Sequence, residues 1–183
     1  MNKKIIIGVS GASGAHIGFN VLEKLPQGSI KHLVVSDHAK VVLNKEVSSN
    51  EDTNIKQYKN SDIGASIASG SYGADIMMIT PCSMNTLAKI ACGIADDLIT
   101  RAASVMIKEN KKLLLAPREM PFSAIALENM LKLSRLGVII APPVAAYYAD
   151  VKSIDEMEDF FIGKWFDLLG IEHNLYKRWS SDD

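Results

Sequence analysis

The chain has 183 residues, 48% of them hydrophobic, so it is long enough for one well-buried core and too short to favour two ordinary domains. Its 20 basic and 21 acidic side chains give a formal charge of -1, which argues against a global attraction to nucleic acid or to an anionic membrane. Any anion site must therefore be built locally. We expect a single domain over 1–183, with an ordered core over about 3–170 and a C-terminal tail over 171–183.

The cysteines and the N-terminal sequence indicate the cellular setting. Cys82 and Cys92 stand alone in the sequence, and the first residues show no signal-peptide pattern. No window approaches the ~18 continuous apolar residues of a membrane-spanning helix. We therefore expect a soluble protein of the reducing cytoplasm, without a disulfide framework.

Short apolar runs alternate along the chain with segments of helical period. The apolar runs predict five buried strands, over 4–9, 31–36, 74–81, 111–117 and 137–143. The segments between and after them predict helices over 13–25, 37–46, 83–93, 96–110, 123–136 and 153–170. A polar stretch over 48–61 has no clear period and is expected to be a mobile loop. The alternation predicts an α/β fold, a doubly wound Rossmann- or flavodoxin-like parallel sheet with helices on both faces.

Ligands of such a sheet bind beyond the carboxyl ends of its strands, which makes the loop after the first strand a candidate site. The glycines of this loop, Gly8, Gly11 and Gly14, lack the spacing of a dinucleotide fingerprint, and no nucleoside-triphosphate loop is present. Ser13 at the expected helix N-terminus suits a monophosphate or a flavin, although a tight turn would use the same glycines. Asp37 after the second strand keeps a dinucleotide site open as an alternative, and it is also a candidate helix N-cap.

Two helices carry polar or charged groups that favour an anionic ligand. Ser83, Asn85 and Thr86 open one helix with three side-chain donors, although Ser83 is also an ordinary N-cap residue. Arg101 and Lys108 are seven residues apart on the next helix and therefore share a face, where they repel unless anions lie nearby. A solvated helix face is the alternative interpretation of this pair.

Further candidates lie at the ends of later elements. Arg118 and Glu119 stand between two prolines directly after a buried strand, where the backbone is stiff. Glu46 closes the second helix, where the helix dipole disfavours a carboxylate, so it calls for a cationic partner. Tyr147 and Tyr148 follow the fifth strand in a loop too short to bury both rings, so we expect one of them to face a ligand or a neighbouring chain.

Several catalytic templates are missing from the sequence. There is no Gly-x-Ser-x-Gly elbow, and the four histidines, at 16, 32, 38 and 173, show no metal-binding spacing with one another or with the cysteines. We therefore expect neither metal catalysis nor acyl transfer, and we interpret His16 as a packed or exposed residue.

The segments "GVSGASGA", "TRAASVMIKE" and "PREMPFSAIALENM" make the chain similar, from about residue 3 to 170, to the UbiX-type flavin prenyltransferases, which belong to a wider family of flavin-containing cysteine decarboxylase-like folds. The resemblance implies that dimethylallyl phosphate prenylates reduced FMN at N5 and C6 without a metal, and the sequence leaves open whether the donor is the phosphate or the pyrophosphate. The implied product, prenylated FMN, serves UbiD-type decarboxylases in ubiquinone biosynthesis or aromatic acid decarboxylation. The resemblance also implies a homododecamer whose active sites are shared between subunits.

The resemblance implies a role for each matching residue. The implied FMN contacts are Gly11, Ala12, Ser13, Ser36, Ser83, Met84, Asn85, Thr86 and Arg118, and the implied prenyl-phosphate contacts are Tyr148 and Lys164. The implied catalytic residues are Ser13, Glu46, Arg101, Lys108 and Glu119. Two alternatives stay open: an FMN-dependent decarboxylase of the same fold, and a flavin carrier subunit without chemistry of its own.

Overall fold

The computed structural model describes residues 2–46, 55–149 and 151–178, with the side chains of 43–46 left out. The first part of the expected mobile loop, 48–54, lies outside these ranges, as do tail residues 179–183. Within the described part of the chain, no helix combines the length and the apolar character that a bilayer crossing needs.

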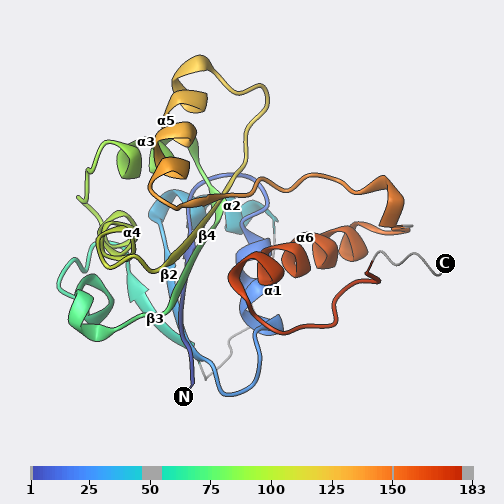
Figure 1. Ribbon diagram of the computed structural model, residues 1–183, viewed down its shortest axis with the longest axis horizontal. Coiled ribbons are helices and arrows are strands. Elements are labelled where there is room, and N and C mark those ends of the chain that lie inside the picture. Colours follow the sequence, from blue (N-terminus) through green and yellow to red (C-terminus); the bar gives the residue numbers. More distant parts are fainter. Residues whose placement is uncertain (1, 47–54, 150, 179–183) are drawn as a thin grey trace.

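The described strands form one six-stranded parallel sheet in the order β3-β2-β1-β4-β5-β6, which confirms the predicted fold class. Figure 1 shows the sheet with helices on both sides. Without the edge strand β3, the other five strands have the order of a flavodoxin-like sheet. The strands are β1 (Lys4–Val9), β2 (Ile30–Val35), β3 (Ile55–Lys59), β4 (Ile76–Cys82), β5 (Lys112–Pro117) and β6 (Ile139–Ile140).

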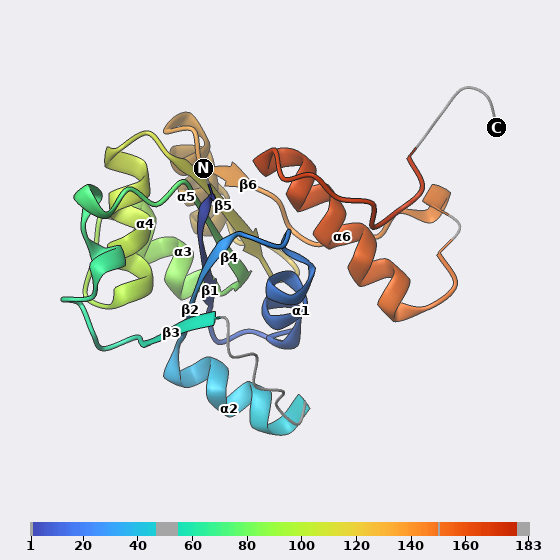
Figure 2. The ribbon, with the colours of Figure 1, turned by 90° about the horizontal axis from the view of Figure 1, so that it is seen from below.

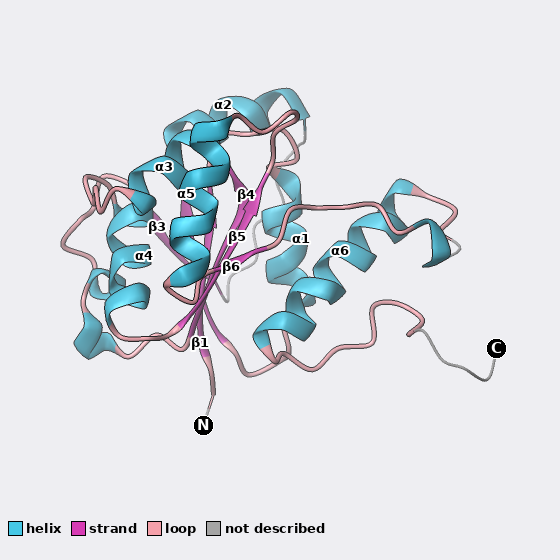
Figure 3. Cartoon of the chain, turned by 45° about the horizontal axis from the view of Figure 1, so that its top comes forward, coloured by secondary structure: helices cyan, strands magenta, loops and turns pink. Residues whose placement is uncertain are grey.

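Helices cover both faces of the sheet, as Figures 2 and 3 show. The helices α3, α4 and α5 pack on one face, and α1, α2 and α6 pack on the other. Their bounds are α1 (His16–Lys24), α2 (Asp37–Glu46), α3 (Met84–Ala91), α4 (Leu98–Lys108), α5 (Ala124–Arg135) and α6 (Ile154–Leu169).

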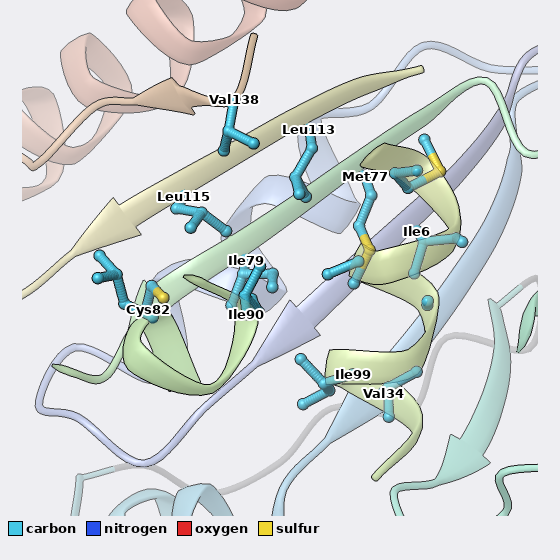
Figure 4. Close-up of a cluster of buried hydrophobic side chains, with 14 of the residues drawn as sticks. Ile6, Val34, Met77, Ile79, Cys82, Ile90, Ile99, Leu113, Leu115 and Val138 are labelled. Atoms are coloured by element: carbon cyan, nitrogen blue, oxygen red, sulfur yellow. The ribbon is translucent and has the colours of Figure 1, made fainter. Parts of the chain in front are cut away.

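The apolar runs of the strands supply two hydrophobic cores. In β1, Ile6 points to the α3–α5 face, whereas Ile5 and Ile7 point to the α1–α6 face. Figure 4 shows the first core, in which Met77 and Ile79 of β4 lie beside side chains of the neighbouring elements. Both faces of each central strand are buried, and this explains why the strands read as continuous apolar runs.

Two strands differ from the sequence-based expectation. β3 forms within the stretch 48–61 that was expected to be a loop, and its residues are polar except Ile55 and Tyr58. An edge strand has one neighbour and one exposed side, so it does not need the apolar character of a central strand. The expected strand over 137–143 is reduced to the two residues of β6, and the rest of this segment leaves the sheet.

Serine side chains cap several helices. Ser83, Ser123 and Ser153 each accept a hydrogen bond from a backbone N–H in the first turn of α3, α5 and α6. The expectation that Asp37 caps α2 is wrong, because Ser36 Oγ accepts from Ala39 N (3.1 Å) and Asp37 is the first helical residue. The helix α1 begins at His16, three residues later than predicted, and Ala15 at its N-cap provides no side-chain cap.

The residues after α6 also differ from the expected tail. We call residues 171–178 the C-terminal strap, because this segment turns back at Gly170 and runs along α6 (Figure 2). Ile171 is buried in the core on the α1–α6 face. The ring of Tyr176 covers Gly163, where an added Cβ would lie only 2.5 Å from Tyr176 Cδ1. This part of the expected tail is therefore packed against the domain.

Candidate active site

The loops at the carboxyl ends of β1 and β4 meet at the switch point of the sheet, where the strand order reverses. Ser10 joins these loops, since its Oγ donates to Pro81 O (2.9 Å) and accepts from Ser83 N (2.7 Å). Two further links extend the edge: Ser36 N donates to Val9 O (2.9 Å), and Arg118 N donates to Cys82 O (3.2 Å). The predicted flavin contacts, which come from four separate segments, thus lie along one edge of the sheet.

A pocket of about 550 Å³ opens at this edge, between α1 and α6. Ser13 and Arg118, both predicted to contact the flavin, line it together. Its other lining residues are Gly14, His16, Ile17, Pro143, Glu158 and Phe161. The pocket has the size and the mixture of apolar and polar groups that small-molecule sites have.

The glycines of the first loop permit close approaches of the backbone. A Cβ at Gly11 would lie 2.5 Å from His38 Cβ, so only glycine lets the loop pass the start of α2. Gly14 has a φ of +82°, which L side chains rarely adopt. Ala12 N closes the turn by donating to Ser10 O (2.9 Å). The loop therefore offers backbone and the Ser13 side chain to a ligand instead of bulky groups.

The start of α3 presents polar groups to the same edge. Ser83 Oγ accepts from Thr86 N (3.3 Å) and donates to Thr86 Oγ1 (3.0 Å), which fixes both hydroxyls. Met84 packs partly against the core, whereas Asn85 is exposed. The positive end of the helix dipole favours a negatively charged or electron-rich ligand here.

The predicted prenyl-phosphate contacts lie beside α6. The ring of Tyr148 packs edge-on against Phe160, with 6.1 Å between the ring centroids. Lys164 is exposed one helical turn after Phe160, on the same side of α6. Within the described part of the chain, the side chains of Lys164 and Arg118 form no hydrogen bond or ion pair, so both cations are available to an anion.

Arg101 and Lys108 are separated from the pocket by the sheet. Both are exposed on α4, which packs on the α3–α5 face, whereas the pocket lies on the α1–α6 side. Lys108, the last residue of α4, forms an ion pair with Glu109 beside Gly70. The strand β5 starts at Lys112, four residues after Lys108, so Lys108 lies toward the amino end of that strand. A single chain therefore does not bring these two cations to the pocket.

The two predicted catalytic carboxylates are described to different extents. Glu119 is exposed next to Arg118, and its Oε1 accepts from Met120 N (3.0 Å). Glu46 is the last residue of α2, and its side chain lies outside the described residues.

Sequence reasoning missed a buried polar group in the pocket wall. Glu158 of α6 accepts from His16 Nε2 (2.6 Å) and from Asn20 Nδ2 (2.9 Å), so it joins α6 to α1. The signal was present, because Glu158 stands in the buried stripe of α6 together with Ile162 and Trp165. A charge inside an apolar stripe indicates a specific partner.

Two observations limit the chemistry available at this edge. Burial raises the pKa of the Cys82 thiol far above its usual range, so this cysteine at the end of β4 is no nucleophile. The described residues contain no cluster of three or more side chains that could hold a metal ion.

Comparison with known proteins identifies the family. A family model described as Flavoprotein matches residues 1–165. The flavin prenyltransferase UbiX of Helicobacter pylori strain 26695 is 51% identical over 183 residues, which cover 96% of this chain and 98% of that protein. This chain belongs to the UbiX-type flavin prenyltransferases, within the flavoprotein family.

Solved structures of this family share the fold over 97–100% of this chain. AnUbiX (PadA1), solved in complex with FMN and dimethylallyl pyrophosphate, is 37% identical, covers 100% of both chains and has a TM-score of 0.94. A dodecameric FMN-dependent UbiX-like decarboxylase of Escherichia coli O157:H7 is 40% identical, covers 97% of this chain and 100% of that chain, and has a TM-score of 0.92. The predicted enzyme class, a flavin prenyltransferase, is therefore confirmed, whereas the roles of individual residues stay predictions.

Proposed function

We propose that this flavin prenyltransferase transfers a dimethylallyl group from dimethylallyl phosphate to N5 and C6 of reduced FMN. The observation that carries the proposal is the pocket at the switch point, where Ser13 and the available cation Arg118 face one ligand-sized space. In the reaction, a bond from N5 to the dimethylallyl carbon replaces the carbon–oxygen bond to phosphate. The alkene of the attached prenyl group then takes up a proton at one carbon and bonds to C6 through the other, which closes a six-membered ring. C6 loses its own proton, so this second step is balanced and phosphate is the only leaving group.

The flavin site would be built from the carboxyl edge of the sheet. The loop over 11–13, Ser36 and the start of α3 over 83–86 would contact the flavin through backbone groups and hydroxyls. Arg118 would hold the phosphate of FMN, since its guanidinium has the donors that a phosphate accepts. Reduced FMN is here a substrate, and prenylated FMN is the product.

The leaving phosphate would be received on α6. Tyr148 and Lys164 lie on the side of α6 that carries Phe160, and the Lys164 ammonium is available as a point charge. A protein cation at the departing phosphate stabilises the charge that develops as the carbon–oxygen bond breaks. This role needs no metal ion.

The remaining catalytic groups would come together by assembly. We propose a homododecamer in which α4 of one chain supplies Arg101 and Lys108 to a pocket of its neighbour, with Glu46 and Glu119 completing the charged cluster. An exposed apolar surface on and near α5, formed by Met120, Ile125, Leu127, Leu131 and Leu136, supports assembly. The dodecameric E. coli relative supports the same proposal.

The product would act outside this protein. We propose that prenylated FMN is passed in the cytoplasm to a UbiD-type decarboxylase, in ubiquinone biosynthesis or in aromatic acid decarboxylation. The domain would span 1–183 as one flavoprotein unit.

The deciding experiment is anaerobic incubation of the protein with reduced FMN and dimethylallyl phosphate, followed by mass spectrometry of the flavin. We expect a flavin heavier by one C5 unit, and no such product when the donor is left out. A flavin that stays bound with unchanged mass would contradict the proposal. Release of carbon dioxide from a cysteine-derived acid would then favour an FMN-dependent decarboxylase, and absence of any turnover would favour a carrier subunit.

A further inference from the structure

The C-terminal strap is fastened to α6 by one carboxylate. Asp167 accepts two hydrogen bonds from the Arg178 guanidinium (2.8 and 3.1 Å), one from His173 Nε2 (3.0 Å) and one from the Tyr176 hydroxyl. His173 also accepts from Leu175 N through Nδ1 (3.1 Å), so its ring is fixed on both sides. Four contacts on one short segment hold the strap in a defined position.

Tyr176 is the strap residue that reaches the donor side of α6. Its ring lies over Gly163, where any larger residue would collide with it. The same ring packs against Phe160, with 5.0 Å between centroids and an interplanar angle of 60°. Gly163 directly precedes Lys164 in α6, and Phe160 lies one helical turn before Lys164. Tyr176, which contacts both Gly163 and Phe160, therefore borders the side of the helix that carries Lys164.

Phe160 connects Tyr176 to Tyr148. Phe160 is buried, with Tyr176 as one aromatic neighbour and Tyr148 as another. Tyr148 stands in a short turn, Tyr147–Ala149, beyond the end of the sheet, and it is 62% exposed. A side chain on such a turn depends on its packing partners for a fixed position.

We propose that the C-terminal strap is part of the prenyl-donor site, with Tyr176 as a positioning residue that holds Phe160, and through it Tyr148, in place beside Lys164. The inference rests on the proposed function, because it takes Tyr148 and Lys164 as contacts of the donor phosphate. It adds that residues beyond α6 set the affinity for the donor without touching it. No strap residue lines the pocket of Ser13 and Arg118, so FMN binding there does not depend on the strap.

The test measures donor and flavin binding separately in strap variants. We expect Tyr176→Ala to raise the KM for dimethylallyl phosphate about fivefold, the size of one lost aromatic contact, while the FMN dissociation constant and kcat change less than twofold. Tyr176→Phe keeps the ring and should retain most of the affinity. Leu175→Ala is the matched control. Leu175 belongs to the same strap, but its side chain packs against the core on the α1–α6 face of the sheet and not against Phe160.

A double-mutant cycle decides whether Tyr176 acts through Tyr148. In a Tyr148→Ala background, Tyr176→Ala should raise the KM no further, since the side chain that it positions is gone. If Tyr176→Ala does not fold, Arg178→Ala at the exposed end of the strap replaces it, with a smaller rise expected. Additive effects in the cycle, an equal rise in Leu175→Ala, or a parallel loss of FMN affinity would each overturn the inference. Failure of the wild type to prenylate FMN would instead overturn the proposed function.

Discussion

At the scale of single residues, Arg118 has the most direct relation to the flavin. Its backbone is tied to β4 through Cys82 O, and its side chain faces the pocket. We expect Arg118→Ala to weaken FMN binding about tenfold to a hundredfold, the loss of hydrogen bonds between a cation and a phosphate. Fluorescence titration of FMN measures this. Arg135→Ala, an exposed arginine at the end of α5, is the control and should leave the affinity unchanged.

His32 is a buried residue whose protonation should affect stability. Tyr58 and Tyr72 contact its Nδ1 (3.2 Å) and Nε2 (2.8 Å), and a neutral ring can donate to one hydroxyl and accept from the other. Burial, reinforced by the charges of Lys56 and Lys4, lowers the pKa of His32 from 6.5 to about 4. The folded state therefore disfavours the protonated ring.

The sign of the pH effect follows from this difference in pKa. Between about pH 6.5 and 4 the unfolded chain binds a proton at His32 that the folded chain does not, so the stabilisation is complete above pH 6.5 and falls toward pH 4. The loss should reach about 3 kcal/mol at most. Urea unfolding at pH 7 and pH 5 measures this change in the free energy of unfolding. The same measurement on His32→Gln, which has no titrating ring at this position, gives the pH dependence due to all other groups. An equal pH dependence in the wild type and in His32→Gln would contradict the assignment.

At the scale of elements, the caps of α3 and α5 offer a matched pair. Ser83 and Ser123 each accept one backbone hydrogen bond, but only Ser83 lies at the switch-point edge. We expect Ser83→Ala and Ser123→Ala each to lower the free energy of unfolding by about 1 kcal/mol. FMN affinity should fall in Ser83→Ala alone. Equal FMN affinities in the two variants would show that the start of α3 does not contact the flavin.

The seating of α1 on the sheet depends on Gly18. An added Cβ would lie 2.5 Å from Val9 Cγ2 and 2.8 Å from Thr80 O, a backbone atom that has little freedom to move. We expect Gly18→Ala to lower the free energy of unfolding by about 1–3 kcal/mol through this overpacking. Gly64→Ala, where the nearest atom to an added Cβ would be Asp62 Oδ1 at an ordinary contact distance of 3.7 Å, should change it by less than about 0.5 kcal/mol. Thermal unfolding of both variants provides the comparison.

The elements show what the sequence could predict and what it could not. The buried strands β1, β2, β4 and β5 were predictable because two covered faces leave continuous apolar runs. The edge strand β3 was missed because one exposed side removes that pattern. The strap was missed because its anchor, Asp167 with Arg178, is a tertiary contact between groups eleven residues apart without apolar periodicity.

At the site, spacing along the chain predicted some neighbours and not others. Ser13 and Arg118 both follow strands, and parallel strands bring their carboxyl ends to one edge, so their meeting in one pocket was foreseeable. The spacing of Arg101 and Lys108 gave their shared face on α4, but not which side of the sheet α4 covers. That depends on the direction of the crossover between strands, which the residues of α4 do not encode.

At the scale of the whole molecule, the positions of α4 and α6 on opposite faces of the sheet make shared sites testable. We expect Lys108→Ala and Lys164→Ala to be inactive alone, because each removes a cation from every site. Mixed assemblies of the two variants should regain about one quarter of the wild-type activity, since random pairing leaves that share of sites with both lysines. Prenylated FMN formation after co-expression of the two chains measures it, with sedimentation to verify assembly.

The outcome separates two arrangements of the site. If each pocket used lysines of its own chain, mixing would restore nothing, because no chain in the mixture carries both residues. Co-expression of Lys108→Ala with Arg118→Ala provides a second test, because Lys108 lies on the α3–α5 face of the sheet and Arg118 lines the pocket on the α1–α6 side. Activity should again return only if a site takes these two residues from different chains.

The burial of Cys82 has a consequence for the durability of the enzyme. Reduced flavins react with dioxygen and release hydrogen peroxide, which oxidises accessible thiolates. Cys82 lies at the end of β4, one residue before the start of the proposed flavin site, yet it is fully buried and its pKa is raised, so it stays a protonated thiol. Peroxide formed when the substrate meets air should therefore attack exposed Cys92 first, at the far end of α3, and leave the flavin edge of the sheet intact.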